Sequence, residues 1–509
     1  MRIRSVVTPF SVGLLALVVY VLTLAPDLTW AHNGADGGDL VTASYLGGAA
    51  HPPGYPLYSL VGRAVAALPI GSIPYRYNLF SALAAAGAAA LVTWAAEESG
   101  LMPAVAAGLA LAFAPLVWSQ AVITEVYALT ALLAAMIVAL SWQQKPRPLA
   151  LGLAFGLGLT HHLTLALFAP LALAAVVRWV GAQSARRVIV RAFIGLLIGS
   201  LPLAWLPLTA RASVGWGDAS TLQGFWWLVS AELYRGYAFA LPAAWIGPRI
   251  AAVAHTLASS FTWVGVTVGL WGLVRLWERD KWLGGASLLS VLALVAFAVG
   301  YNTTDSEVYL IPALVVFAMW VGVGWGSVLA WLSSFLLVRS LRAGSAKSAE
   351  AGRPRLLRLV GQAVMVSSQR SVVRRGVLVF MLAVPALVLA RNWSAQDLRA
   401  DRTAYAARNF VDGVMTKAPA RAMVVTSQDR HTFALWVGTL VEWQRPDLAV
   451  VDQDLMGYDW YRARLRRSFP DLSVPEMSGD IGELARANPG RPVCRPAETP
   501  PSWVSCEDE

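Results

Sequence analysis

Long apolar blocks separated by short basic loops are the feature that most constrains this chain. Each block runs for about 17 to 25 residues, the length a helix needs to cross roughly 30 Å of hydrocarbon. The first block extends from Val6 to Ala25, and several others follow it. Because 57% of the residues are hydrophobic and only 14% are charged, an ordinary soluble domain is excluded. The sequence therefore predicts a mainly α, polytopic membrane protein.

The first apolar block has a second interpretation, a secretory signal peptide, because Arg2 and Arg4 precede it. However, it is long for the apolar core of a signal peptide. The residues before Pro26 also lack a clean cleavage site with small residues at both required positions. We therefore expect this block to be retained as the first membrane helix.

Lys and Arg orient the predicted helices, because short cytoplasmic loops accumulate positive charge. The strongest such signal lies in residues 334–375, where nine basic residues face one acidic residue. The Ala, Gly and Ser of this cytoplasmic loop predict that much of it is flexible. From a cytoplasmic N-terminus, the same rule predicts about 11 membrane helices within residues 1–390. It places two large loops, 26–75 and 211–248, on the outer side.

The apolar stretch from Pro148 to Arg178 is too long for a single span, yet basic residues flank both of its ends. It must therefore cross the membrane twice. The outer break between the two crossings is expected at His161 and His162.

Residues 391–509 follow the last predicted helix and should form a small extracytoplasmic domain. Two short β-branched runs, Ala422 to Thr426 and Leu448 to Val451, lie between polar turns, and helical patterns surround them. These patterns predict a mixed α/β domain. The only two cysteines, Cys494 and Cys506, can pair there in an oxidising compartment, and they indicate neither a thiol catalyst nor a cysteine metal site.

The formal net charge of +10 does not indicate nucleic-acid binding. The basic residues lie in short loops beside apolar blocks, whereas a nucleic-acid site gathers them in one patch with aromatic residues. The sequence also shows no internal repeat of the kind found in inverted-repeat transporters.

The outer loop after the first helix carries the residues that most suggest chemistry. It contains Asp36 and Asp39, which glycines flank, and then His51-Pro-Pro-Gly-Tyr-Pro. Ionisable groups near a bilayer are costly, so a carboxylate pair there points to a functional site. The alternative is that Asp36 caps the following helix and the glycines only make turns. A rigid turn alone would likewise explain the proline-rich segment.

These residues resemble one family of membrane glycosyltransferases. It is the family that includes the vertebrate O-mannosyltransferase acting on plexin-type (IPT) domains. Further similar motifs follow in the same order along most of the chain: Gly62-Arg63, Trp118-Ser-Gln, Glu125-Val-Tyr-Ala-Leu, Gly158-Leu-Thr-His-His, Gly215-Trp-Gly-Asp, Tyr301 with Asp305 and Tyr309, Ser427-Gln-Asp-Arg-His and Asp452-Gln-Asp-Leu-Met. One departure concerns the acidic pair. Many members have Trp before the first acid and Glu as the second, where this chain has Ala35 and Asp39.

The resemblance implies a GT-C type glycosyltransferase that uses a polyprenyl-phosphate sugar on the outer or luminal face. The preferred sugar is mannose, transferred with inversion to Ser or Thr of an exported protein or to an envelope glycan. The predicted topology suits this donor, because a lipid-linked sugar phosphate stays at the membrane interface. No nucleotide-binding glycine loop is needed, and the sequence has none. No metal site is expected, and a divalent metal requirement stays open.

Three roles are expected at this site. Asp36 is the candidate general base, while Asp39 shares that role or orients the acceptor. The family motif adds Glu125, although stabilisation by a helix dipole explains a carboxylate in a first helical turn about as well. One or two of five outer cations should bind the phosphate, the rest being surface residues: Arg63, His161, His162, Arg211 and Arg235. The sugar pocket should include His51, Tyr55, Tyr127, Trp216, Asp218, Asp305 and Tyr309, for which interface anchoring and turn capping are alternatives.

Two other functional classes stay open. A transporter or lipid flippase also has many helices, but it predicts charges near helix midpoints and broken, paired helices. Here the acidic residues lie in outer loops and at helix ends. A binding or scaffold protein is the third class, and it would tolerate replacement of both Asp36 and Asp39.

Overall fold

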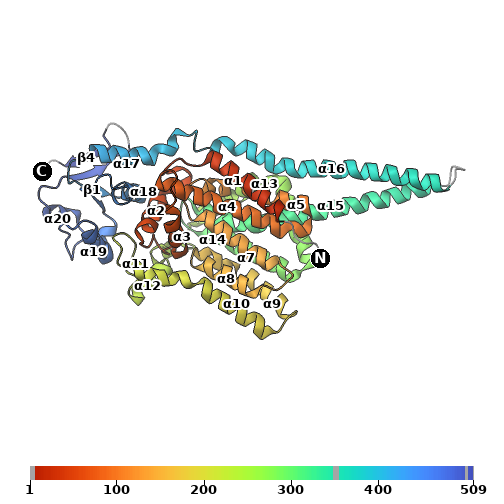
Figure 1. Cartoon of the computed structure of the whole chain (residues 1–509), viewed down its shortest axis with the longest axis horizontal. Helices are drawn as coiled ribbons and strands as arrows, with labels where there is room; N and C mark the ends of the chain where they lie inside the picture. Colours follow the sequence, from red (N-terminus) through yellow and green to blue (C-terminus); the bar gives the residue numbers. More distant parts are fainter. Residues whose placement is uncertain (1–5, 348–354, 499–501, 508–509) are drawn as a thin grey trace.

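Long helices make up the body of the molecule, and a smaller α/β domain lies at one end of it. The computed structural model describes residues 6–347, 355–498 and 502–507. The N-terminus and the hairpin of α15 (Ile311–Lys347) and α16 (Arg355–Gln396) lie at the end opposite to the C-terminal domain (Figure 1). One end of the bundle therefore carries the α/β domain, and the other carries the α15–α16 hairpin.

Within the described residues, seven helical segments are long and apolar enough to cross a membrane: Ile73–Ser99, Leu163–Val180, Ala185–Thr209, Ala243–Arg279, Lys281–Gly300, Ser306–Phe335 and Arg375–Gln396. An eighth is a bent pair, α5 (Leu101–Ala112) and α6 (Pro115–Ala121), whose axes differ by 63°. Three shorter apolar helices are α1 (Val7–Thr23), α7 (Tyr127–Trp142) and α8 (Pro148–Leu159). These elements confirm the predicted fold class, and the chain is a multi-pass integral membrane protein.

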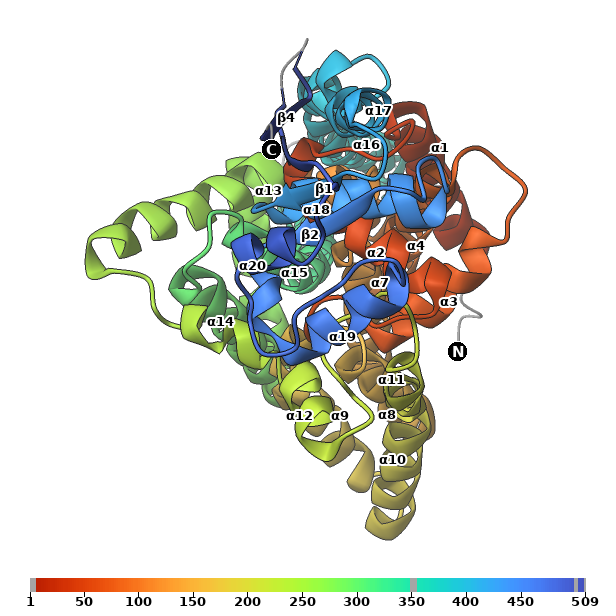
Figure 2. The same ribbon diagram turned by 90° about the vertical axis from the view of Figure 1, so that its left-hand side faces the viewer.

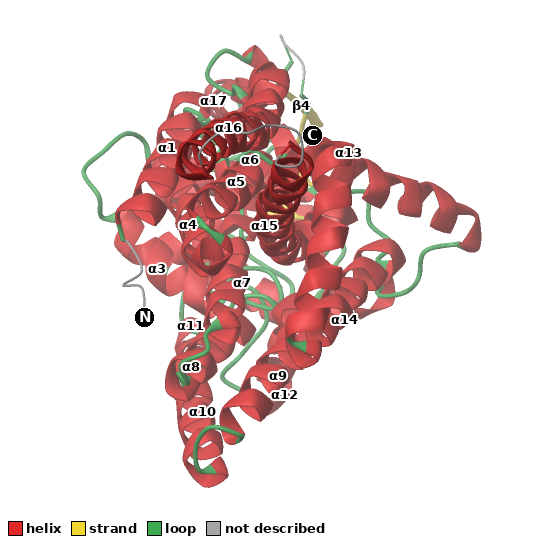
Figure 3. Ribbon diagram, turned by 90° about the vertical axis from the view of Figure 1, so that its right-hand side faces the viewer, coloured by secondary structure: helices red, strands yellow, loops and turns green. Residues whose placement is uncertain are grey.

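α15 is the central helix of this bundle. In an 18-residue apolar window of the span Ser306–Phe335, which α15 forms together with η6 (Ser306–Leu310), 94% of the residues are buried, against 17% for the span at the end of α16. α15 packs against α4 (Ile73–Ala96), α5, α7 and α13 (Ala243–Arg279). The view along the bundle shows α13 with α14 (Lys281–Gly300) on one side and α8 to α10 on another (Figure 3). The apolar helices thus surround α15 and diverge from it towards the periphery.

Small residues allow α8 (Pro148–Leu159) and α10 (Ala185–Gly199) to touch backbone to backbone. Gly152 and Gly156 of α8 face Gly195 and Gly199 of α10. A Cβ added at Gly152 would lie 1.9 Å from the Ala192 carbonyl oxygen. Such pairs of small residues four apart are typical of membrane helix contacts, where packing replaces the hydrophobic effect.

The two large loops predicted on the outer side are largely built of short helices. The first contains η1 (Ala31–Asp36), α2 (Gly37–Leu46) and α3 (Pro56–Ala66). The second contains α12 (Leu222–Val229) and η5 (Glu232–Tyr237), and the short α11 (Leu206–Thr209) leads into it. These elements lie between the bundle and the C-terminal domain, where they position the candidate site (Figures 1 and 2).

The C-terminal domain is a four-stranded sheet with helices around it. Its strands are β1 (Met423–Thr426), β2 (Ala449–Asp452), β3 (Val493–Pro496) and β4 (Val504–Glu507), in the order β2-β1-β3-β4. β1 pairs in parallel with β2 and β3, and β4 is antiparallel to β3. Its helices include α17 (Ala406–Lys417), α18 (Asp429–Trp436), α19 (Asp459–Ser468) and α20 (Ile481–Arg486). The predicted mixed α/β domain is confirmed, with its first two strands within one residue of the expected runs.

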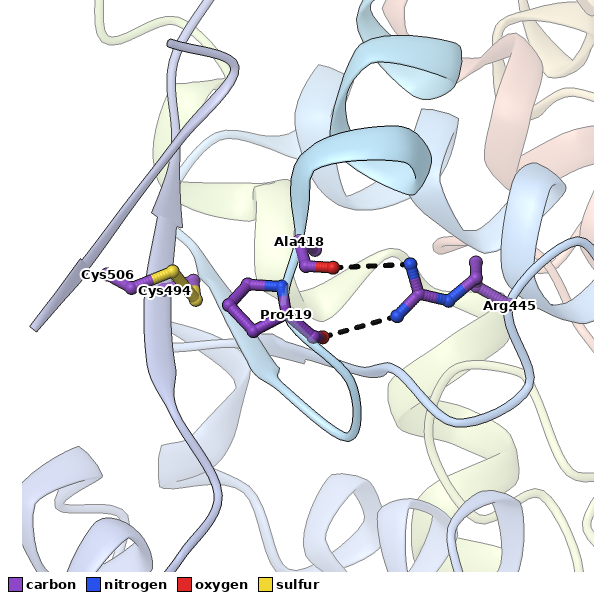
Figure 4. Close-up of a disulfide and its surroundings, with 5 residues drawn as sticks. All are labelled: Ala418, Pro419, Arg445, Cys494 and Cys506. Carbon is purple, nitrogen blue, oxygen red and sulfur yellow. Dashed lines mark hydrogen bonds between the residues drawn. A yellow bond between two sulfur atoms is a disulfide. The ribbon is translucent and has the colours of Figure 1, made fainter.

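A disulfide joins Cys494 of β3 to Cys506 of β4 and ties the edge strand to the sheet. Close to it, Arg445 donates hydrogen bonds to the carbonyl oxygens of Ala418 and Pro419, both at 3.2 Å (Figure 4). The residues before β1 and those before β2 are thereby held together. Both cysteines of the chain are used in this way, so neither is a free thiol.

One expectation about local structure is wrong. Much of residues 334–375 was expected to be flexible, but α15 continues to Lys347 and α16 begins at Arg355. Between them, residues 348–354 lie outside the described part. The reason is that Ala, Leu, Arg and Gln, which are common in this segment, are strong helix formers, and a positive charge density does not by itself prevent a helix.

Candidate active site

Asp39 is a fully buried carboxylate with three hydrogen-bonding contacts. It lies in the first turn of α2 and is 0% exposed. Its Oδ2 accepts the backbone N–H of His51 at 2.8 Å and lies 2.8 Å from the ring Nδ1 of the same residue. Its Oδ1 accepts the indole N–H of Trp216 at 3.0 Å. Both oxygens are therefore occupied by protein donors, and Asp39 is built to hold its neighbours in place.

His51 bridges this buried carboxylate and Asp36. Its Nε2 lies 3.5 Å from Oδ2 of Asp36, on the other side of the ring from Asp39. Burial lowers the pKa of His51, but the negative charges of Asp36 and Asp39 outweigh this effect and raise that pKa to about 9. The imidazole is therefore a cation at neutral pH, with one N–H directed at each carboxylate.

Asp36 is the accessible member of this group. Its side chain is 40% exposed, and it makes no capping hydrogen bond to α2, although it occupies the N-cap position. The capping alternative is therefore not what the structure shows. Enclosure by the protein raises the pKa of Asp36, the charge of His51 lowers it, and the charges of Asp39 and Asp305 raise it.

Glu125 is buried in the turn between α6 and α7. Glu125 is 3% exposed, and its Oε2 accepts the backbone N–H of Val126 at 3.3 Å. α7 begins at Tyr127, so Glu125 lies two residues before this helix. Burial, followed by the charge of Asp36, raises the pKa of Glu125 well above its usual value. Asp36 and Glu125 thus lie in one acidic cluster, although their motifs are far apart in sequence.

A continuous shell of rings lies beside the acidic cluster. His51 meets Tyr55 edge-on, with ring centroids 5.1 Å apart, and Tyr55 lies 6.0 Å from His161. His162 lies 5.8 Å from both Tyr127 and Tyr309. The structure therefore brings together predicted pocket residues from the first loop, from α7, from the turn after α8 and from the segment before α15.

The two histidines after α8 are buried components of this shell. His161 is 0% exposed, and its Nε2 lies 2.9 Å from the carbonyl oxygen of Val126. His162 uses its Nδ1 to contact the hydroxyl of Thr164 at 2.7 Å. α8 ends at Leu159 and the next helical segment begins at Leu163, so the break predicted at these histidines is present.

The structure separates the predicted cations. Arg211 is exposed, and Arg235 is 62% exposed and pairs with Glu232 at 3.9 Å. Arg63 directs its guanidinium towards Gly47, at the end of α2. These arginines are thus spread over the outer segments, and no described contact joins Arg211 or Arg235 to the acidic cluster.

Asp218 and Asp305 also differ from each other. Asp218 accepts the backbone N–H of Ser220 at 3.1 Å and the hydroxyl of the same residue at 2.6 Å, which is the turn-capping geometry. Asp305 instead precedes η6 (Ser306–Leu310), and its charge raises the pKa of both Asp36 and Glu125. Asp305 therefore belongs to the acidic cluster, whereas Asp218 stabilises a turn.

Sequence reasoning missed a cation beside Asp305. Arg249 of α13 donates a hydrogen bond to the carbonyl oxygen of Thr303 at 2.7 Å and another to the hydroxyl of Ser306. The signal that could have found it is an arginine inside an apolar helix, because such a charge is costly unless it has a role.

The C-terminal domain supplies a further carboxylate that the predictions missed. α18 packs on α2 so closely that a Cβ at Gly38 would lie 2.4 Å from the carbonyl oxygen of Phe433. Asp429 begins α18, and burial together with the charge of Asp36 raises the pKa of Asp429 to about 6. Its motif, Ser427-Gln-Asp, was noted in the sequence, but nothing there indicated that it meets the loop of residues 26–75. Within the described residues, no group of three or more His, Cys, Asp or Glu is arranged to hold a metal ion.

Two family models match segments of this chain. Residues 36–185 match the model of the protein O-mannosyl-transferase TMEM260 N-terminal domain, and residues 406–475 match TMEM260-associated domain 2. The chain resembles the TMEM260 protein O-mannosyl-transferases. This finding confirms the family resemblance that the motifs indicated. The two matched segments carry the acidic pair of the first loop and the α18 region of the C-terminal domain.

Two curated TMEM260 proteins illustrate the extent of the similarity. The Mus musculus protein O-mannosyl-transferase TMEM260 is 26% identical over 506 residues, which cover 91% of this chain and 65% of the mouse protein. The Dictyostelium discoideum protein O-mannosyl-transferase tmem260 is 20% identical, over 90% of this chain and 58% of its own length. The chain thus spans less than two thirds of the length of these TMEM260 proteins.

Solved structures of ArnT from Cupriavidus metallidurans share the fold of this TMEM260-like chain. The structure bound to undecaprenyl phosphate has a TM-score of 0.55 at 16% identity and covers 88% of this chain and 90% of ArnT. The apo structure has a TM-score of 0.54 at 17% identity, with the same coverage. The GT-C-like fold class is confirmed by this similarity.

Proposed function

We propose that this chain is a GT-C glycosyltransferase that moves a sugar, preferably mannose, from a polyprenyl phosphate to a hydroxyl of an exported protein or envelope glycan. The observation that carries the proposal is the accessible carboxylate of Asp36 beside the cationic His51, which Asp39 holds from behind. The names of the TMEM260 relatives support mannose, and ArnT bound to undecaprenyl phosphate supports a polyprenyl-phosphate donor.

Asp36 is the proposed general base. Its carboxylate accepts the proton of the acceptor hydroxyl while that oxygen attacks the anomeric carbon. The bond from this carbon to the phosphate oxygen breaks on the opposite face, and the phosphate leaves with the electron pair, so the configuration inverts. Because enclosure raises the pKa of Asp36, its carboxylate is a stronger base than an exposed aspartate, and His51 keeps it ionised.

Asp39 is the proposed positioning residue for this base. It is fully buried and its oxygens already accept hydrogen bonds, so it offers an acceptor substrate no free oxygen. A buried carboxylate behind a histidine fixes the orientation of the ring and stabilises its charged form. The geometry thus supports the order that the sequence suggested, with Asp36 for proton transfer and Asp39 for orientation.

The leaving phosphate requires donors or cations on the other side of the sugar. The ring shell places N–H and O–H groups from His162, Tyr127 and Tyr309 beside the acidic cluster. Arg249, which lies next to Asp305, and Arg63 are the arginines we propose for the phosphate. In this arrangement the rings would bind the sugar, and the arginines would neutralise the charge of the phosphate.

The site and the C-terminal domain are proposed to be extracytoplasmic, with the N-terminus in the cytoplasm. The positive charge of the short loops supports this orientation. The disulfide between Cys494 and Cys506 supports it independently, because disulfides persist in oxidising compartments. The transporter alternative gains no comparable support, since the acidic cluster lies outside the helical spans.

The proposal is tested with the full chain in lipid nanodiscs, labelled polyprenyl-phosphate mannose and candidate acceptor proteins. Asp36→Asn should lower the transfer rate by about 10² to 10⁴-fold, the usual contribution of a general base. The control is Asp454→Asn, which removes an exposed carboxylate from the C-terminal domain. Absence of transfer with any lipid-linked sugar, or full activity of Asp36→Asn, would overturn the proposal.

A further inference from the structure

The indole that holds Asp39 comes from a segment with little structure of its own. Trp216 lies in the 209–217 loop, between α11 and α12, and Gly217 in this loop has a left-handed backbone with φ of 66°. Trp216 is 3% exposed and its backbone N–H donates to the carbonyl oxygen of Ala49 at 3.0 Å. A loop of this kind needs support from outside to fix one indole N–H on one carboxylate oxygen.

Arg464 of α19 supplies this support from the C-terminal domain. Its Nη2 donates to the carbonyl oxygen of Gly217 at 2.9 Å, and its Nη1 donates to those of Ala212 at 3.2 Å and Thr209 at 3.5 Å. One guanidinium thus holds the 209–217 loop on both sides of Trp216. In the view onto this domain, α19 lies beside α11 (Figure 2).

The burial of Arg464 indicates that this contact is its main role. The residue is 4% exposed, and burying a charged group is costly unless hydrogen bonds compensate it. A planar guanidinium can bridge several carbonyl oxygens in fixed directions, which an ammonium cannot do. One helical turn further on, the hydroxyl of Ser468 donates to the carbonyl oxygen of Ser213 at 2.7 Å. α19 therefore binds the same loop through two side chains.

We propose that Arg464 is a positioning residue of the active site, acting through the 209–217 loop and Trp216 on Asp39. Three hydrogen-bonded links and one charge contact form a path: the guanidinium holds the loop, the indole holds Asp39, and Asp39 orients His51, whose Nε2 lies 3.5 Å from Asp36. The C-terminal domain is then a working part of the catalytic centre. This inference rests on the proposed function for its catalytic consequence, but not for its structural one.

Hydrogen exchange of the full chain in nanodiscs tests the structural consequence without any substrate. Arg464→Met should speed amide exchange in residues 209–218 and also in residues 37–51, where the backbone N–H of His51 donates to Asp39. The matched control is Arg467→Met, on the exposed side of the same helix. Faster exchange that is confined to α19, or no change in residues 37–51, would overturn the inference. If Arg464→Met does not fold, Ser468→Ala should give a smaller change in the same segments.

A double-mutant cycle with Trp216→Phe tests the catalytic consequence. Arg464→Met and Trp216→Phe should each lower kcat by up to about 10²-fold, with a smaller change in KM, because a small misplacement of catalytic groups has that effect. The double variant should be no slower than the slower single variant, since both act on one path. Additive losses would show that Arg464 acts elsewhere. If the wild type transfers no sugar while the exchange coupling is present, the proposed function fails and the positioning role stands.

Discussion

Removing the charge of His51 should move the acidic limb of the pH profile upwards. Asp36 must be ionised to act as a base, so activity rises with pH through its pKa in the folded protein. Enclosure raises that pKa and the cationic His51, 3.5 Å away, lowers it. In His51→Gln nothing opposes the effect of enclosure on the pKa of Asp36. The acidic limb of the activity profile should therefore lie at higher pH than in the wild type.

The size of this shift follows from Coulomb's law. Two unit charges 3.5 Å apart attract by about 1.2 kcal/mol at the dielectric constant of water and by about 4.7 kcal/mol at an effective constant of 20. One pKa unit corresponds to about 1.4 kcal/mol, so these limits equal about 1 and about 3 units. Because the Asp36 side chain is 40% exposed, solvent screens the pair, and we expect a shift of about one unit.

The assay is kcat/KM for sugar transfer between about pH 5 and pH 9, which reports the groups of the free enzyme. His255→Gln is the control, because His255 is an exposed histidine of α13. A limb that stays in place in His51→Gln, or moves to lower pH, would refute the assignment of Asp36 as the base under the influence of His51. A similar shift in the control would show that the change is not local.

Three further predictions concern stability, docking and orientation. The folded state raises the pKa of His51 from 6.5 to about 9, so its stabilising effect is complete below about pH 6.5 and is lost as pH rises towards 9; thermal unfolding should show a decline of Tm over this interval that is absent in His51→Gln. Gly38→Ala should lower the free energy of unfolding by about 1 to 3 kcal/mol, because the carbonyl oxygen of Phe433 cannot move aside. Gly457→Ala is the control, since Gly457 has open space around it and its replacement should not lower the stability. Denaturation in detergent compares the two variants, and equal stabilities would contradict the contact. A reporter enzyme inserted at Lys145 should give a cytoplasmic signal, because this loop is expected on the cytoplasmic side. An external signal there would overturn the proposed orientation.

Sequence patterns predicted the fold class because membrane helices depend on local composition. Each apolar block is long enough to be recognised without its neighbours, and even the break at His161 followed from length and flanking charge. The expectation of flexibility in the 334–375 segment came from its Ala, Gly and Ser, but its many Ala, Leu and Arg residues favour a helix. Charge patterns orient helices, but they do not show where a helix ends.

The roles within the site could not be predicted in the same way. The sequence suggested Asp36 as the base but allowed Asp39 to share that role, and what separates them is the burial of Asp39 under Trp216, which lies 177 positions further along the chain. Arg464 has the appearance of a surface charge on a polar helix, since the 209–217 loop that buries it comes from another segment. Asp429 is an exposed residue of α18, and the packing of α18 on α2 brings it near Asp36. Only three-dimensional contacts bring these two residues to the proposed centre.

The way these contacts join the two parts of the chain favours the proposed transferase over the transporter alternative. Alternating access requires one group of elements to move against another around a substrate path. Here the backbone of α2 touches that of α18 at Gly38, and Arg464 fixes the 209–217 loop on the opposite side of Asp39. Movement of the C-terminal domain would therefore break the group of Asp36, His51 and Asp39. A constellation held from two sides is what a proton transfer at fixed distance needs, and it is poorly suited to a gate that must open.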